Sequence, residues 1–367
     1  MTKPRLLLVA RTRYALPLSP SLERKFEALR ERFDLRVLAT SADGRARDVG
    51  TFRLVGRLPL LDGPLFYLLL PLRVRRLARE HRPVAIVTQS PYEAAFVWLG
   101  RTRAHVVVEL HGDWRTATRL YGSPLRRALS PLGDAVGAFG LRRAAAVRTI
   151  SSYTSNLVRE LGVEPAAEFP AFMDLELFSD RPPVPLPPTS AALFVGVLEL
   201  YKNVDGLAAA WRLVAQRLPG AQLRIVGRGS RADVVKRLAA ELPAQTTWVE
   251  RLSQEDVARA MDEATCLVLP SRSEGLGRVL IEAGLRERGV VAMAVGGIRD
   301  VVEDGVDGLL VSSDEELADA LVRVLTDRPL AERLGAGARR SAERWLASPD
   351  DYAERIAALL KPYTGTT

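Results

Sequence analysis

The chain has 367 residues, of which 47% are hydrophobic and 26% charged. This length suffices for two domains of ordinary size, and the composition is that of a soluble globular protein. One cysteine, Cys266, excludes a disulfide framework and a cysteine-built zinc site, and there are only three histidines. The sequence contains no run of eighteen apolar residues, so we do not expect a membrane span. The start MTKPRLLLVA does not resemble a secretory signal, and we therefore expect a cytoplasmic protein.

The net charge of +8 is unevenly distributed along the chain. Residues 1–180 contain 28 basic and 18 acidic residues, whereas residues 181–367 contain 24 and 26. A basic half suits a phosphorylated substrate, anionic lipid or nucleic acid. Only five of the 52 basic residues are lysine, which indicates a general preference for arginine. Because zinc-finger spacing, RNA-binding aromatic motifs and basic heptads are all missing from the sequence, we do not expect nucleic acid as a partner.

Short apolar strands alternate with helical stretches through the first half. Strands are predicted at 6–10, 34–39, 84–89, 105–110 and 146–151, and a helix at 21–33. The second half repeats this pattern with strands at 192–197, 222–227, 265–270 and 290–295. Nearly continuous apolar strands between helices indicate parallel sheets that are covered on both faces, so the predicted class is α/β with doubly wound domains.

A proline-rich stretch separates the two halves. The segment SDRPPVPLPPTSA, residues 179–191, has five prolines in thirteen residues. Such a stretch forms a stiff connector, and we therefore predict one domain over 1–178, a linker over 179–191 and a second domain over 192–347. Ligands bind beyond the carboxyl ends of the strands in open α/β sheets, which makes the cleft between the two domains the expected site.

The segment 270–311 carries the most informative pattern. Glu274 follows a predicted strand in a glycine-containing loop that opens a helix, and Glu282 lies eight residues later in that helix. On a continuous helix the two carboxylates would be about 12 Å apart along the axis, which is too far for a glycosidase-like pair. They suit opposite ends of one elongated ligand, with the amides of Gly275, Leu276 and Gly277 at the helix N-terminus favouring an anion.

The E-x7-E spacing, the preceding PS and the following VGGIRDVVEDGVDGLLV resemble family 4 (GT4) retaining glycosyltransferases. GVLELYKN (196–203), LRIVGRGS (223–230) and ELHGDW (109–114) resemble further motifs of the family, in the expected order. The resemblance implies the GT-B fold, with two Rossmann-like domains facing a cleft. It also implies that the C-terminal helix, about 348–367, packs back on the first domain.

The resemblance also implies roles for individual residues. Glu282 would bind the ribose of a nucleotide sugar, Glu274 would face the donor sugar, and the amides of 275–277 would contact the sugar or the diphosphate. Lys202 would neutralise the leaving diphosphate and His111 would touch the sugar, while Gly196 and Arg228 would lie beside the phosphates. The family needs neither a metal nor another cofactor, and we expect a UDP-linked donor more than a GDP-linked one.

The chain also departs from the family pattern at several positions. Val197 replaces a common arginine that grips the diphosphate, for which Arg228, Arg272 or Arg278 would have to substitute. EAGLRERG differs from the usual EAMA segment, and ARTRYALPLSP differs from the usual glycine-rich loop after the first strand. Two alternatives therefore stay open: a catalytically silent nucleotide-sugar-binding partner of an active transferase, and an NAD-type oxidoreductase. The latter lacks the G-x-G-x-x-G motif after a first strand.

The acceptor is the least determined part of the prediction. The resemblance suggests a cell-envelope glycan, a lipid-linked intermediate or a small molecule. The segments 58–80 and 125–146 combine apolar residues with arginines, a pattern that suits peripheral contact with the inner face of a membrane. For 58–80 the simpler prediction is a core helix with its arginines in water.

Overall fold

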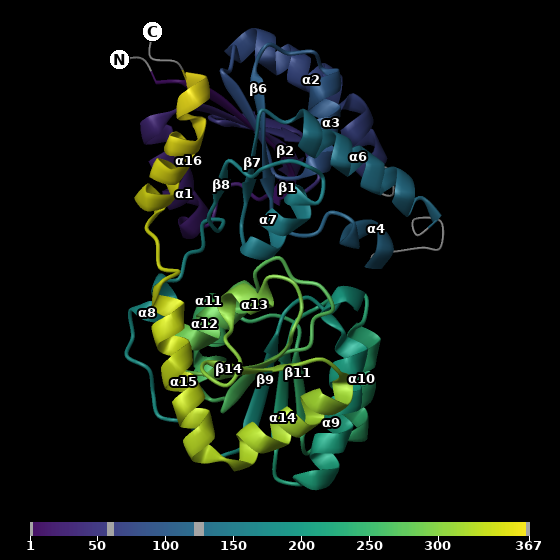
Figure 1. Cartoon of the computed structure of the whole chain (residues 1–367), viewed down its shortest axis with the longest axis vertical. Helices are drawn as coiled ribbons and strands as arrows, with labels where there is room; N and C mark the ends of the chain where they lie inside the picture. Colours follow the sequence, from purple (N-terminus) through teal and green to yellow (C-terminus); the bar gives the residue numbers. More distant parts are fainter. Residues whose placement is uncertain (1–2, 57–61, 121–127, 365–367) are drawn as a thin grey trace. The chain divides into compact units, whose positions relative to one another are not determined.

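The computed structural model describes residues 3–56, 62–120 and 128–364. The chain divides into two compact units. The first contains most of the chain up to Phe172 and the segment from Ala347 onward, and the second contains Met173–Leu346. The proline-rich stretch 179–191 therefore lies within the second unit. Each unit is built on one sheet whose strands are all or mostly parallel (Figure 1).

The first unit has an eight-stranded sheet in the order β3-β4-β2-β1-β5-β6-β7-β8. All neighbouring strands are parallel except β3 and β4, which are antiparallel. The five strands predicted for this half are present, whereas β3, β4 and β8 are short and carry no continuous apolar run. The strands are β1 (Arg5–Tyr14), β2 (Asp34–Ser41), β3 (Arg47–Val49), β4 (Phe52–Val55), β5 (Ala85–Thr88), β6 (His105–Leu110), β7 (Ala146–Thr149) and β8 (Ala167–Glu168).

Two helices from opposite ends of the chain share one core of the first unit. Phe26 and Leu29 of α1 (Pro20–Arg32) are buried with Tyr352 and Ile356 of α16 (Pro349–Thr364). Figure 1 shows α16 beside α1. The end of the chain thus belongs to the same hydrophobic core as its beginning. The other helices of this unit are α2 (Asp62–His81), α3 (Pro91–Leu99), α4 (Thr116–Leu120), α6 (Ser130–Arg143) and α7 (Ser152–Arg159).

Helix α2 is a core helix, as predicted for the segment 58–80, although residues 58–61 lie outside the described residues. Phe66, Leu70, Val74 and Leu77 recur at helical spacing, and all are buried against the sheet. The opposite side of the helix exposes apolar surface as well, because Leu68 is 71% exposed and Leu72 is 65% exposed. Residues 125–127 of the second arginine-rich segment also lie outside the described residues.

The second unit has a six-stranded parallel sheet in the order β11-β10-β9-β12-β13-β14. This is the Rossmann order, in which the first and fourth strands of the unit lie side by side. The first three strands are added toward one edge of the sheet and the last three toward the other, although all six run parallel. The four strands predicted here are present, and β11 and β14 add one at each edge. The strands are β9 (Ala191–Val195), β10 (Gln222–Val226), β11 (Thr246–Val249), β12 (Cys266–Leu269), β13 (Gly289–Met293) and β14 (Gly308–Val311).

Helices cover both faces of this sheet (Figure 1). The helices are α8 (Glu176–Ser179), α9 (Val204–Arg217), α10 (Ala232–Glu241), α11 (Gln254–Asp262), α12 (Arg278–Leu285), α13 (Ile298–Val301), α14 (Asp314–Thr326) and α15 (Arg328–Glu343), with a short 3₁₀ turn at Leu200–Lys202. Helices α10 and α14 pack against α9, whereas α8, α11 and α15 pack against α12. Cys266 is fully buried, and burial raises the pKa of its thiol to about 12.

Two buried arginines hold the proline-rich stretch to this unit. Arg286 pairs with Asp262 and donates to the carbonyl of Arg181 at 2.7 Å. Arg288 donates to the carbonyls of Val184 and Asp262. Prolines have no N–H with which to form a ladder, so their stretch leaves carbonyls that need donors. The departure EAGLRERG from the family pattern therefore has a structural function: it supplies the two guanidinium groups that meet this need.

Candidate active site

The strand order of the second unit brings two loops together. β9 and β12 are hydrogen-bonded neighbours at the point where the sheet reverses, and such a point is where open α/β sheets bind ligands. The loop after β9 carries Gly196 and Lys202, and the loop after β12 carries Glu274. The sequence presented these residues as separate motifs, and the fold places Lys202 and Glu274 in direct contact.

Lys202 and Glu274 form an ion pair that is largely shielded from water. The Lys202 Nζ lies 2.5 Å from Glu274 Oε2, and the two side chains are only 10% and 15% exposed. Ser271 Oγ donates to the same carboxylate oxygen at 3.2 Å. A shielded ammonium at a ligand-binding edge can stabilise negative charge that develops beside it, and the carboxylate fixes its position.

Glu282 is the second predicted carboxylate, and it lies on α12. It is 8% exposed, and its Oε1 accepts from Arg278 Nε at 2.6 Å. Arg278 also donates to the carbonyl of Asp174 at 2.9 Å. Burial raises the pKa of Glu282, and the guanidinium of Arg278 opposes this shift. Because α12 begins only at Arg278, Glu274 lies outside the helix, and the helical separation expected between the two carboxylates does not apply.

The loop between the two carboxylates packs against a pair of glycines. The Gly297 N–H donates to the carbonyl of Glu274 at 3.0 Å, and Gly277 caps α12 in the left-handed region with φ 86°. Leu276 is buried, so its side chain packs inside the unit and only its backbone is available to a ligand. The VGG motif is explained by this packing, since a side chain at Gly297 would collide with the loop.

We expect Gly297→Ala to disturb this loop while leaving the rest of the unit folded. The added Cβ would lie 2.0 Å from the carbonyl oxygen of Gly275, so the loop must shift, at a cost of about 1–3 kcal/mol in stability. Gly220→Ala is the matched control, because a Cβ there meets nothing within 4 Å. Nucleotide affinity should fall in Gly297→Ala alone, measured by calorimetric titration. Equal affinities in the two variants would contradict the assignment of this loop to the site.

The turn after β9 allows a close approach of backbones. A Cβ at Gly227 would lie 1.9 Å from the carbonyl oxygen of Gly196, so the loops after β9 and β10 touch through glycine.

Val197, which replaces the family's arginine, is 45% exposed at the turn after β9. Of its three candidate substitutes, Arg278 is occupied by Glu282. Arg228 and Arg272 are exposed and form no ion pair within the part of the chain that the structure describes.

His111 follows β6 at the carboxyl edge of the first unit's sheet. Its ring Nε2 lies 3.7 Å from Glu109 Oε2, and its side chain is 35% exposed. Partial burial lowers the pKa of His111; the positive charge of Arg148 lowers it further, against the opposing effect of Glu109. A neutral imidazole that can donate or accept a hydrogen bond is therefore favoured near pH 7. Asp113 accepts from both the backbone N–H and the side chain of Arg115, which orders the loop after His111.

The charged cluster behind His111 was not predicted. Arg148 is completely buried, and its Nη2 lies 3.0 Å from Glu109 Oε1. The Tyr352 hydroxyl donates to the same oxygen at 3.3 Å, and Arg148 also donates to the carbonyls of Phe169 and Pro170. Burial alone would raise the pKa of Glu109, but Arg148 and His111 hold it well below its usual range. The sequence contains one sign of this cluster: the otherwise apolar strands HVVVEL and AVRTIS each include one charged residue on the apolar run, Glu109 and Arg148.

The carboxyl edge of the first unit holds a second polar group. Glu93 is buried at the start of α3 and accepts from the backbone N–H of Arg11 at 3.1 Å. Thr12 donates to the side chain of Gln89 at 2.8 Å. β1 and β5 are neighbours at the point where the strand order of this sheet changes direction, so these residues lie where open α/β sheets bind ligands. No recognisable motif marks these residues in the sequence, since ARTRYALPLSP replaces the usual glycine-rich loop.

Neither a metal cluster nor a membrane-spanning helix is found in the described ranges. No group of three or more histidine, cysteine, aspartate or glutamate side chains is arranged there to hold an ion. Among residues 3–56, 62–120 and 128–364, no helix is both long and apolar enough to cross a bilayer.

Two Rossmann-like units, one with a lysine–carboxylate pair at its switch point and a buried glutamate on the following helix, define the GT-B class of glycosyltransferase folds. Residues 183–341 match the family described as glycosyl transferases group 1, and residues 19–169 match the glycosyl transferase 4-like domain. The chain belongs to the GT4 glycosyltransferases.

Curated relatives are similar over part of their length. The chain is 31% identical over 217 residues to a D-inositol 3-phosphate glycosyltransferase of Nocardioides, covering 54% of the chain and 47% of the relative. It is 28% identical over 249 residues to the alpha-D-kanosaminyltransferase of Streptomyces kanamyceticus, covering 64% of each. The chain thus spans about half the length of the inositol-phosphate relatives that it matches.

Solved structures share the fold over nearly the whole chain. Sucrose-phosphate synthase from Thermosynechococcus elongatus superposes with a TM-score of 0.80 at 20% identity, covering 98% of both chains. Anabaena Alr3699/HepE, solved with UDP and glucose, gives a TM-score of 0.71 at 19% identity and covers 98% of this chain and 99% of that one. At these identities the likeness establishes the fold and leaves the ligands to be argued from the site.

Proposed function

We propose that this protein transfers a sugar from a nucleotide-diphosphate donor to a hydroxyl of an acceptor, with retention at the anomeric carbon and without a metal. The observation that carries the proposal is the shielded Lys202–Glu274 pair at the switch point of the second unit. A cation held there suits a diphosphate, and the carboxylate beside it suits the hydroxyls of a sugar. Glu282 binds the ribose, and a UDP-linked donor is favoured over a GDP-linked one.

The bond changes in the proposed reaction balance without a protein base. The bond between the anomeric carbon and the leaving diphosphate oxygen breaks, and the acceptor hydroxyl oxygen bonds to the same face of that carbon. The hydroxyl proton passes to the departing phosphate, and the nucleoside diphosphate is released. Lys202 stabilises the charge on the leaving group, while His111 orients the sugar through a hydrogen bond. Positioning and charge stabilisation supply most of the rate enhancement in such a scheme.

A catalytically silent nucleotide-sugar binder is the second candidate, and the exposed Val197 favours it. An active transferase would release nucleotide slowly from its donor even without acceptor, whereas a silent binder would only retain the donor. Arg228 and Arg272 are the two cations from which an active enzyme would replace the missing arginine. The NAD-type oxidoreductase is disfavoured, because the family to which the chain belongs uses other chemistry.

The first test is a thermal-shift screen against UDP, GDP, ADP, TDP and their common sugars, without metal. A ligand at 100 times its dissociation constant should stabilise the protein by about 2.7 kcal/mol. We expect Glu282→Ala to abolish the shift, because the ribose loses its carboxylate acceptor and Arg278 is left beside the site. Glu255→Ala on the exposed start of α11 is the control. An undiminished shift in Glu282→Ala would contradict the ribose assignment, and no shift with any nucleotide would contradict the donor proposal.

The acceptor is proposed only as a class: a cell-envelope glycan, a lipid-linked intermediate or a small molecule. The inositol-phosphate relatives make a phosphorylated polyol a reasonable first small acceptor to try. A lipid-linked acceptor would bring the first unit to a membrane surface, where Leu68 and Leu72 of α2 present exposed apolar side chains next to exposed arginines. Under this proposal the protein works in the cytoplasm, at the inner face of the membrane where the acceptor is lipid-linked.

A further inference from the structure

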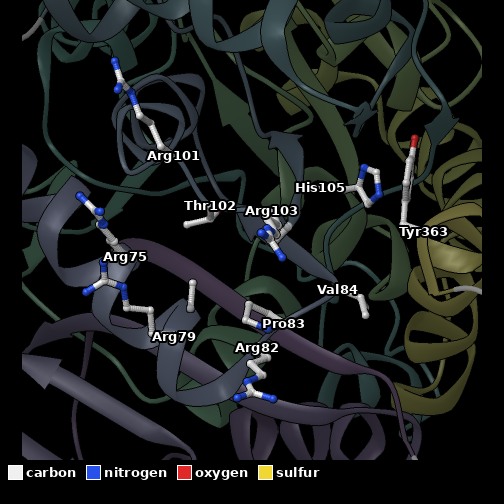
Figure 2. Close-up of a pocket in the computed structure, with 12 residues that line it drawn as sticks. Arg75, Arg79, Arg82, Pro83, Val84, Arg101, Thr102, Arg103, His105 and Tyr363 are labelled. Atoms are coloured by element: carbon white, nitrogen blue, oxygen red, sulfur yellow. The ribbon is translucent and has the colours of Figure 1, made fainter.

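A large hollow lies at the amino ends of β5 and β6 in the first unit (Figure 2). Its volume is about 940 Å³. It is lined by the end of α2, the residues just before β5, the loop between α3 and β6 with the first residue of β6, and Tyr363 of α16. β6 begins at His105 in the hollow and ends just before His111, so about 20 Å of strand separates the two. The hollow is therefore remote from the carboxyl edge of the same sheet.

The lining is strongly cationic. Five arginines and His105 contribute to it, and none of its twelve residues is acidic. Figure 2 shows arginines of α2 on one side of the hollow, Arg103 near its centre, and His105 with Tyr363 on the other side. The arginines are Arg75, Arg79, Arg82, Arg101 and Arg103.

None of these five arginines forms an ion pair within the part of the chain that the structure describes. Arginines close to them do: Arg53 and Arg76 both bind Glu80, which lies next to Arg79 in the sequence. The carboxylate of Glu80 is therefore shared by two arginines that do not line the hollow. Like charges gathered on one concave surface produce a positive potential that an anion would relieve.

Helix ends account for only part of this charge. The carboxyl ends of α2 and α3 lie at the hollow, and a helix C-terminus favours a cation. Arg82 and Arg101 follow these ends in the left-handed region, with φ 51° and 48°, where glycine or asparagine fits more easily. Arg75 lies well before the last turn of α2, and Arg103 lies just before β6. The helix ends do not explain why these two face the same hollow.

We propose that this hollow binds a phosphate-bearing anion, at a site separate from the donor site. Guanidinium forks match phosphate oxygens in pairs, and several forks suit a ligand with more than one negative charge. Pro83, Val84 and Ala104 give the hollow an apolar floor. Tyr363 is fixed at its wall, because its hydroxyl donates to the carbonyl of Ala145 at 2.8 Å and its ring lies 4.8 Å from that of His105. The phosphate belongs either to a free phosphorylated compound or to a lipid headgroup.

The test uses inorganic tripolyphosphate as the soluble probe and vesicles of equal parts phosphatidylglycerol and phosphatidylcholine as the lipid probe. The full chain is titrated with each, and hydrogen–deuterium exchange locates the protected peptides. The variant Arg79→Gln/Arg103→Gln removes two exposed guanidinium groups from the hollow. The variant Arg45→Gln/Arg355→Gln, which changes two exposed arginines elsewhere in the same unit, is matched in charge.

We expect tripolyphosphate, the vesicles or both to protect the backbone of 75–84 and 101–106. The dissociation constant should rise at least about tenfold in the hollow variant and stay within about twofold in the control. Protection by the soluble probe assigns a free phosphorylated ligand, and protection by vesicles alone assigns a headgroup. Equal weakening in both variants would show a general charge effect and overturn the proposal.

The donor site is distinguished in the same experiment. Protection confined to 196–203 and 274–282, unchanged in the hollow variant, would mean that the phosphate binds at Lys202 alone. This result would overturn the second site and leave the proposed function intact. Conversely, the hollow could be protected in a protein that no nucleotide stabilises in the thermal-shift screen. This result would support the second site and contradict the donor proposal.

Discussion

Replacing Lys202 with alanine should lower kcat for sugar transfer by about 10²–10³-fold. The ammonium is the shielded cation of the switch point, and its carboxylate partner Glu274 holds it there. Negative charge grows on the leaving diphosphate in the transition state, so the loss should appear mainly in kcat and less in KM. The measurement is nucleotide release from whichever donor gives a thermal shift, with and without acceptor.

Three variants separate catalysis from folding in this case. Lys202→Ala also leaves the largely shielded carboxylate of Glu274 without its charge partner, which should lower stability by about 1–3 kcal/mol. The double variant Lys202→Met/Glu274→Gln removes both charges and should regain most of that stability without regaining activity. Lys236→Ala, on the exposed side of α10, is the control for loss of a lysine in the same unit. Recovery of kcat in the neutral pair would show that Lys202 acts only on structure.

The site motifs were predictable one by one, whereas their contact was not. The glycine turn with Lys202 and the loop with Glu274 were recognisable because each follows an apolar strand and is short. Their meeting depends on β9 lying beside β12, and strand order is a property of the whole sheet that periodicity along the chain does not report. Glu274 was correctly expected in a loop, but its separation from Glu282 was estimated on a continuous helix. That estimate does not apply, because the left-handed backbone of Gly277 sets the start of α12, which the apolar pattern does not report.

Buried charge was the feature that the sequence concealed. Arg148, Arg286 and Arg288 are all almost completely buried, in a chain whose arginines are mostly exposed. Arginine is so common here that composition gives no sign of which guanidinium groups are structural. What distinguishes the buried ones is their set of acceptors, and these acceptors are carbonyls and carboxylates distant in the sequence. Only the folded chain brings them together.

Glu109→Gln should reduce the free energy of unfolding by about 3–5 kcal/mol. Arg148 is fully buried, and its contact with Glu109 at 3.0 Å is an ionic contact in which Nη2 lacks a well-aligned hydrogen bond. The carboxylate charge is therefore the main compensation for a guanidinium that the core cannot solvate. Urea unfolding at neutral pH measures the loss. Asp350→Asn breaks the exposed pair with Arg32 and should cost at most about 1 kcal/mol.

The acid dependence of stability gives a second readout of the same pair. The pKa of Glu109 is lower in the folded protein than in the unfolded chain, so the unfolded chain binds the proton more readily. This carboxylate therefore contributes its full stability above the ordinary pKa of glutamate, and the contribution is lost progressively as the pH falls below that value. Wild type should lose stability on acidification more steeply than Glu109→Gln. Parallel pH profiles for the two proteins would show that Arg148 is held by its carbonyl acceptors, Phe169 and Pro170, and not by the charge of Glu109.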